Sequence, residues 1–179
     1  MNEETIIQHT RRWIEDVVIG CNFCPFAKRE MDRGTIFYRV VSDAPDLFLL
    51  LREEMERLDN TPALETTLII LPEQLTAFTD YLDMLYQLED FLIQEEYEGI
   101  YQLASFHPQY KFEGSTADDP ANFTNRSPYP MFHLLREESI EKALEFYPDD
   151  PDDIPDRNIR FARQKGLAYM EVLRKACFE

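Results

Sequence analysis

Apolar residues recur at two different spacings along the chain, and the alternation between them predicts alternating helices and strands. β-branched and aromatic residues cluster in three short runs, residues 35–41, 66–71 and 100–106, which indicates strands. The run over 66–71 is continuously apolar, so we expect it to be buried on both faces. Five other segments have apolar residues every three or four positions, as amphipathic helices do: residues 2–20, 45–58, 75–92, 139–146 and 156–177.

The order of these elements predicts the fold class. Helix and strand alternate over the first hundred residues, which favours an α/β fold with helices packed on a sheet. We expect a single compact domain over residues 1–179, with a small, mostly parallel sheet of three or four strands. Pro45 is expected to open the second long helix, and the acidic, proline-rich residues 148–156 to form a surface loop. Residues 105–137 fit neither spacing, so we predict a long irregular loop there.

Composition and charge narrow the range of partners. Lys and Arg number 18 against 35 Asp and Glu, a net charge of −17. This balance argues against binding nucleic acid, and no polybasic segment is present to dock on an anionic membrane. It leaves a small anionic molecule open as a partner, because a local arginine cluster can override the net charge. The acidic N-terminal segment does not resemble a signal peptide and the cysteines are sparse, so we expect a cytoplasmic protein.

Residues 105–137 are the predicted functional region. Long irregular segments in compact domains are often functional, and this one follows a predicted strand, where open α/β sheets commonly place their sites. The five glycines lie far apart, which excludes a standard dinucleotide or P-loop motif, and no cofactor is predicted. Asn122 and Asn125 can bind a substrate or can pin the loop through their amides. The remaining candidates are two histidines and two arginines: His107, His133, Arg126 and Arg136.

Cys24 is the candidate nucleophile outside that region. Pro25 suits the first turn of a short helix, and a helix N-terminus favours a thiolate. A buried structural cysteine is the equally supported alternative. Cys21 and Cys24 form a Cys-x-x-Cys pair, but a zinc knuckle needs a second such pair, and a redox motif should follow a strand.

Three motifs together resemble a bacterial family of about this length, the domain-of-unknown-function family 1415. The resemblance covers nearly the whole chain and implies no particular activity. It implies an aliphatic residue at the position of Cys21, which weakens the two-cysteine hypotheses. The motif positions are occupied by Cys24, His107, Asn125, Arg126, His133 and Arg136. The motifs are Cys24-Pro25-Phe26-Ala27, Phe106-His107-Pro108, and Asn125-Arg126-Ser127-Pro128-Tyr129-Pro130 followed by His133-Leu134-Leu135-Arg136-Glu137.

Three functional hypotheses remain open. The first is an enzyme acting on a small anionic substrate, with Cys24 as nucleophile, His107 or His133 as base, and arginine and asparagine side chains as substrate ligands. The second is a mononuclear metal site with Cys24, His107 and His133 as ligands. The third is a non-enzymatic module that binds a ligand in the pocket formed by the polar loop.

Overall fold

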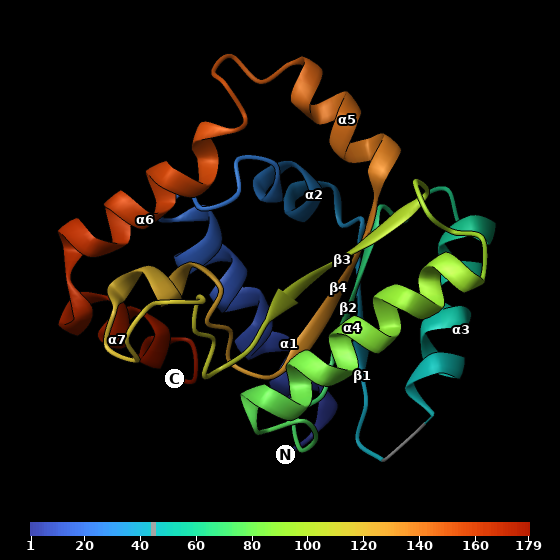
Figure 1. The fold of residues 1–179 in the computed structure, drawn as a ribbon, viewed down its shortest axis with the longest axis horizontal. Helices are drawn as coiled ribbons and strands as arrows, with labels where there is room; N and C mark the ends of the chain where they lie inside the picture. The colour runs from blue at the N-terminus through green and yellow to red at the C-terminus, as the bar shows by residue number, and fades with distance from the viewer. Residues whose placement is uncertain (44–45) are drawn as a thin grey trace.

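Four strands form one sheet at the centre of the fold (Figure 1). The computed structural model describes residues 1–179 except residues 44–45, so the prediction for Pro45 lies outside the described residues. The sheet has the order β1-β2-β4-β3. Every residue of β2 is buried, as its continuous apolar run predicts. The strands are β1 (Ile36–Val40), β2 (Thr66–Ile70), β3 (Tyr101–Phe106) and β4 (Met131–Arg136).

The pairing of the strands corrects the prediction of a mostly parallel sheet. β1 and β2 pair in parallel, whereas β4 pairs antiparallel with both β2 and β3. β1, β2 and β3 therefore point the same way, as helical crossovers require. The fourth strand, β4, lies between β2 and β3 and runs the opposite way. The sheet is consequently mixed, and the sequence pattern did not predict the strand that makes it so.

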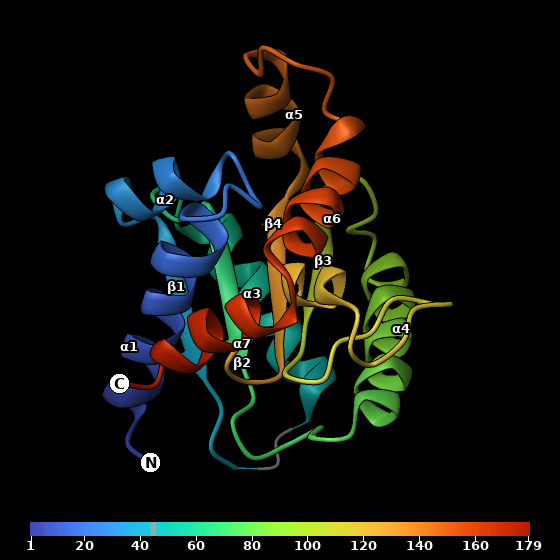
Figure 2. The ribbon, with the colours of Figure 1, turned by 90° about the vertical axis from the view of Figure 1, so that its left-hand side faces the viewer.

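Helices cover both faces of the sheet (Figure 2). α3 (Leu47–Asn60) and α4 (Phe78–Gln94) pack on the face formed by side chains such as Ile69, Phe132 and Leu134. The other face, with Leu68, Ile70 and Met131, is covered mainly by the N-terminal and C-terminal helices. These are α1 (Glu3–Arg12), the π-helix η1 (Trp13–Ile19), α2 (Ala27–Arg33), α6 (Asp153–Lys165) and α7 (Leu167–Ala176).

The N-terminal helix changes its winding at Trp13. α1 has ordinary helical geometry and is capped by the Asn2 side chain, which accepts a hydrogen bond from the Thr5 N–H group. η1 continues it as seven residues of π-helix, and Gly20 donates its N–H to the Glu15 carbonyl five residues earlier. π-helical turns are uncommon and occur frequently at functional sites. This one buries Trp13 against the sheet.

Several segments differ from the sequence-based boundaries. Residues 105–137 contain the short 3-10 helix η2 (Pro120–Thr124) and all of β4, so part of the predicted irregular loop is regular. α6 begins at Asp153, inside the predicted acidic loop, and Pro155 lies in its first turn, where a proline needs no hydrogen-bonded N–H. α5 (Glu137–Glu145) forms as expected. No described helix is both long and apolar enough to cross a lipid bilayer.

Candidate functional site

A cavity of about 270 Å³ lies between the sheet and the helices η1, α2 and α5. Its floor is the face of the sheet that carries Leu68. Most of its wall is apolar, and the polar groups that reach it are few. The residues that line it include Trp13, Cys24, Glu30, Glu65, Leu68, Ala104, Phe106, His133, Arg136 and Ser139.

The strand register divides this cavity into two ends. His133 pairs with Leu68 and with Ala104, so these three residues lie side by side across the floor. Leu135, two positions further along β4, pairs with Thr66. Glu65, Arg136 and Ser139 line the cavity near this pair. We call the part around His133 the aromatic end and the part around Glu65 the polar end. The cavity runs towards the start of β2, away from the carboxyl ends of the parallel strands where the sequence analysis placed the site.

Two nitrogen atoms at the aromatic end, Trp13 Nε1 and His133 Nε2, are buried without a hydrogen-bond partner among the described residues. Both nitrogens are covered by neighbouring atoms, so they do not face the open volume of the cavity. Trp13 is only 2% exposed, and its ring packs edge-on against Phe106, with 5.0 Å between ring centroids. The ring of Phe106 also lies 6.1 Å from that of His133. The three rings therefore pack together at this end of the cavity.

Burial determines the protonation state of His133. Removal from water disfavours the charged imidazolium and lowers the pKa of His133 to about 4. The ring is therefore neutral at neutral pH. A neutral imidazole has one N–H donor and one acceptor nitrogen, and either tautomer can present a hydrogen-bonding group to the cavity.

The polar end carries two carboxylates and one guanidinium, and Arg29, which does not line the cavity, forms an ion pair with Glu30. The Glu65 carboxylate accepts a hydrogen bond of 2.5 Å from Ser139 Oγ, and the Glu30 carboxylate accepts one of 2.6 Å from Thr35 Oγ1. Arg136 also lines the cavity, but its guanidinium already donates to the Leu64 carbonyl, the Leu58 carbonyl and the Tyr101 hydroxyl. These bonds use three of the five N–H donors of Arg136 and leave its positive charge unpaired, so its role as an anion ligand stays a prediction.

Cys24 precedes α2 and lines the aromatic end. Burial raises the pKa of its thiol, while the N–H groups of Phe26 and Ala27 and the charge of Arg157 act in the opposite direction. The net effect of burial is larger, so the neutral thiol is favoured. This differs from the thiolate that the helix N-terminus predicts.

A second cavity of about 350 Å³ lies on the other side of Cys24. It is bordered by Phe106, Thr124 and Asn125, and by Asn158 of α6. Cys24 thus lines one cavity with His133 and another with Asn125. In the second cavity the polar groups are engaged: Asn125 Nδ2 donates to the Ser105 carbonyl, and Asn158 Nδ2 donates to the Phe23 carbonyl.

His107 lies apart from this arrangement. Its Nε2 is 2.9 Å from the Leu75 carbonyl oxygen and its Nδ1 is 3.0 Å from the Gln109 nitrogen, so the two backbone partners fix a neutral tautomer with the proton on Nε2. Its ring contacts Phe78 and Tyr81 of α4, on the opposite face of the sheet from Cys24. His107 is fully buried, and burial lowers its pKa.

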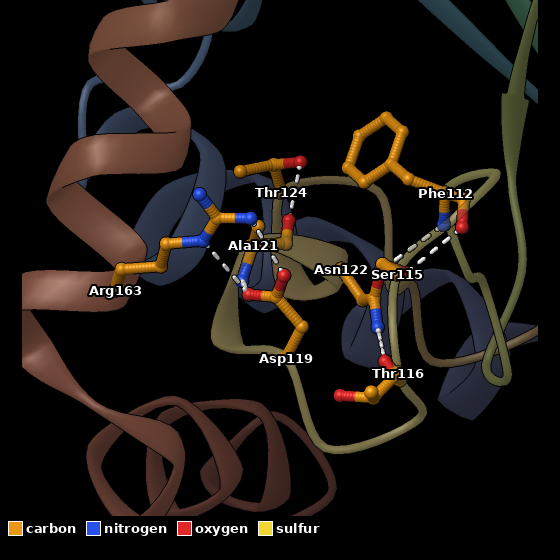
Figure 3. Close-up of polar contacts among 8 residues, drawn as sticks. All are labelled: Phe112, Ser115, Thr116, Asp119, Ala121, Asn122, Thr124 and Arg163. Atoms are coloured by element: carbon orange, nitrogen blue, oxygen red, sulfur yellow. Dashed lines mark hydrogen bonds and ion pairs between the residues drawn. The ribbon is translucent and has the colours of Figure 1, made fainter.

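Asn122 and Arg126 hold the loop that precedes β4. Asn122 Oδ1 accepts hydrogen bonds from the Phe112 N–H and Ser115 Oγ, and its Nδ2 donates to the Thr116 carbonyl (Figure 3). Arg126 donates to the carbonyls of Tyr110 and Ala117. Neither residue lines either cavity.

Nearby, Asp119 caps η2 and forms an ion pair with Arg163 of α6 (Figure 3). The Arg163 guanidinium and the Ala121 N–H group hold the pKa of Asp119 below its usual range. The pair joins this loop to α6.

The three ligands of the metal hypothesis are not brought together. In the part of the chain that the structure describes, no group of three His, Cys, Asp or Glu side chains is placed to hold a metal ion. Cys24 and His133 share a cavity, whereas both nitrogens of His107 have backbone partners on the other face.

A family model described as a protein of unknown function (DUF1415) matches residues 5–172. The chain belongs to this family. The match confirms the resemblance carried by the three motifs. Among curated proteins and among solved structures, none matches the chain significantly.

The DUF1415 motifs occupy different places in the structure. Cys24 and His133, from the first and third motifs, line the same cavity, while His107, from the second, packs under α4. Sequence reasoning missed Trp13, Glu30 and Glu65, which also line this cavity. The only signal for Trp13 was that the single tryptophan of the chain lies on the apolar stripe of the first helix. The carboxylates gave no signal, because the chain is rich in acidic residues.

Proposed function

We propose that this protein binds a small, largely apolar molecule in the cavity between the sheet and η1. The observation that carries the proposal is the cavity itself, whose wall is largely apolar and has a few polar side chains towards one end. Ligand sites typically combine apolar walls with a few polar groups that fix orientation. This corresponds to the third hypothesis of the sequence analysis, with the pocket moved from the polar loop to the sheet.

The volume of the cavity supports this proposal. An apolar cavity of about 150 Å³ already takes up benzene. The present cavity, at about 270 Å³, has room for a substituted aromatic ring or a short branched chain. An apolar molecule that binds there would remove its own surface and that of the wall from water, which favours binding.

The charges around the cavity favour this ligand class over a small anion. Arg126 does not line the cavity, and the guanidinium of Arg136, which does line it, shares the cavity with two carboxylates. Glu30 and Glu65 would also repel a carboxylate or phosphate at the polar end.

Binding can be measured by a ¹⁹F NMR titration with benzotrifluoride, an uncharged aromatic probe. We expect saturable binding to the wild-type protein. Ala104→Leu puts a larger side chain into the cavity, and we expect it to weaken binding by about tenfold or more. Gln102→Leu is the matched control, because residue 102 lies two positions earlier on the same strand, is exposed and does not line the cavity. Absence of saturable binding, or equal loss in both variants, would contradict the proposal.

Thiol chemistry at Cys24 is a second candidate function. The observation that favours it is that Cys24 and His133 line one cavity, where the neutral imidazole could accept the thiol proton. In that reaction Cys24 Sγ would be the nucleophile and His133 the base. The raised pKa of Cys24 opposes it. The alkylation experiment described in the Discussion separates this candidate from binding alone.

A further inference from the structure

We infer that α5 is a movable lid on the cavity between the sheet and η1: it opens to admit the ligand, and the bound ligand then holds it closed. The inference rests on the proposed function and adds how access to that site is controlled. It follows from the position of α5, from how little of the helix is buried, and from the few contacts that hold it.

α5 covers the cavity with one face. Ser139, Ile140 and Ala143 line the cavity, and their spacing of three or four residues places them on the same side of the helix. Glu141 and Lys142 point away from this side and are exposed to solvent. Figures 1 and 2 show α5 at one end of the molecule, between the end of β4 and the segment that leads to α6. The helix therefore forms an outer wall of the cavity.

α5 is also the wall with the least packing. None of its residues is buried, and none of those described belongs to or packs against either apolar core cluster. By contrast, η1 buries Trp13 and Val18, and α2 packs Ala27 and Met31 against the core. An isolated helix of nine residues is only marginally stable in water, so α5 needs packing that its cavity-facing side lacks. We therefore expect α5 to open locally at a lower free-energy cost than the rest of the fold.

The contacts that hold α5 closed lie towards its two ends. Near its start, Ser139 Oγ donates a hydrogen bond of 2.5 Å to the Glu65 carboxylate. Just after its end, the Tyr147 hydroxyl accepts one of 2.9 Å from Arg157 Nη1. The Tyr147 ring also packs against Phe26. Because these contacts are few, the helix can move away while the sheet and α6 stay in place. A ligand in the cavity would give the inner face of α5 the packing that it lacks.

The first test follows hydrogen exchange by mass spectrometry on the full chain. In the free protein, the peptide over residues 137–147 should exchange at least about tenfold faster, after correction for sequence, than that of the fully buried strand β2. Benzotrifluoride at ten times its Kd should slow exchange of this α5 peptide about tenfold, because opening requires the probe to leave. The probe should have no such effect in Ala104→Leu, whereas Gln102→Leu should behave as wild type.

The second test loosens the lid with Tyr147→Phe. This variant keeps the ring but removes the acceptor for Arg157, and Tyr147 lines neither cavity. The rate constants for binding and release of benzotrifluoride, from ¹⁹F line shapes, should each rise about fivefold, as expected for the loss of one net hydrogen bond. Kd should change less than about twofold, because the closed free and closed bound states both contain this bond.

Tyr97→Phe is the matched control. Its hydroxyl donates to Asp59, and neither residue lines a cavity, so both rate constants should stay at the wild-type values.

The outcomes distinguish the inference from the proposed function. The cavity remains a binding site but α5 is a fixed wall if its peptide exchanges as slowly as β2, or if the probe binds without slowing that exchange. The same conclusion follows if Tyr147→Phe leaves both rate constants unchanged, or if Tyr97→Phe raises them equally. Absence of saturable binding of benzotrifluoride would overturn the proposed function, and the lid with it.

Discussion

Burial has the largest effect on the protonation state of three side chains in the sequence motifs. The motif residues Cys24, His107 and His133 all have pKa values displaced towards the neutral form, and removal from water is the largest cause for each. Residue type and spacing predicted that these groups were candidates for chemistry. They could not predict which of them would meet a backbone partner and which would meet a cavity, because that depends on the sheet register.

Cys24 is partly buried and should behave as a thiol that is largely removed from water. Since burial raises its pKa, we expect slow alkylation by iodoacetamide at neutral pH, with a rate that rises only in alkaline solution. The rate is measured against pH by mass spectrometry of the Cys24 peptide. The same peptide in urea-unfolded protein serves as the reference, and Cys24→Ser confirms the assignment. Faster reaction in the folded than in the unfolded protein at neutral pH would support the enzymatic candidate instead.

His133 should make stability depend on pH. Its folded-state pKa of about 4 lies below the ordinary value of 6.5, so the unfolded chain binds the proton more readily between these values. The free energy of unfolding should therefore fall as pH decreases through this range, by up to about 3 kcal/mol, and the loss should level off below the folded pKa. The measurement compares urea unfolding of wild type and His133→Phe across the range. A constant difference between the two proteins would show that His133 does not titrate as described.

The N-terminal helix illustrates how an element can position a site without a visible sequence signal. Apolar spacing predicted one helix up to Gly20, and α1 and η1 do form one continuous helix. The change to π-helical winding at Trp13 could not be predicted, because both windings bury a similar apolar stripe. That winding brings Trp13, Ile14 and Val18 to the cavity wall.

Gly20 should be required by this winding. A Cβ atom at residue 20 would collide with the Asp16 carbonyl oxygen, although the backbone of Gly20 is ordinary right-handed helix. Helix propensity alone predicts that Gly20→Ala stabilises the protein by roughly 0.5–1 kcal/mol. We expect the opposite, a loss of about 1–3 kcal/mol from overpacking, measured by thermal or urea unfolding. Glu15→Ala, at an exposed position of the same π-helix, is the control and should change little. A stabilised Gly20→Ala protein would refute the described geometry.

The hydrogen bonds of Asn122 favour one of the two sequence interpretations of this residue. The sequence left Asn122 open as a substrate ligand or a loop pin. The structure gives it three hydrogen bonds to residues of its own loop, and the side chain is fully buried. The loop in turn leads into β4, the strand that carries His133.

Asn122→Ala should therefore destabilise the protein without acting on the cavity directly. Loss of three hydrogen bonds predicts a decrease of about 3 kcal/mol in the free energy of unfolding. Limited proteolysis should also cut residues 109–119 faster. Asn60→Ala removes a single exposed hydrogen bond and is expected to be nearly neutral. Unchanged stability of Asn122→Ala would contradict the assignment of this residue as a pin.

Sequence predicted three strands and the helices that connect them, because each has a clear apolar period. It missed β4 for a physical reason. Residues 131–136 follow Pro128 and Pro130, and their apolar residues are interrupted by His133 and include none that is β-branched, so neither spacing nor composition marks a strand. The mixed pairing of the sheet follows from this strand alone. The floor of the cavity, which includes His133, could not be predicted without it.

At the scale of the whole molecule, the three-layer arrangement creates the cavity. α3 and α4 cover one face of the sheet with a continuous apolar cluster. On the other face the π-helix and the C-terminal helices form a second cluster. The cavity lies at the border of this second cluster, where α2 and α5 meet the start of β2. A small sheet thus has a packed apolar cluster on each face, and the cavity lies at the edge of one of them.

The most direct test of the cavity as a ligand site is diffraction from a crystal equilibrated with iodobenzene, whose iodine is located by anomalous scattering. The account predicts one strong iodine peak between Leu68, Phe106 and His133, with the fold unchanged, and no such peak in Ala104→Leu. A wild-type crystal in which side chains fill this space, or in which iodine is found only at the surface, would contradict the proposal that the protein binds an apolar molecule there.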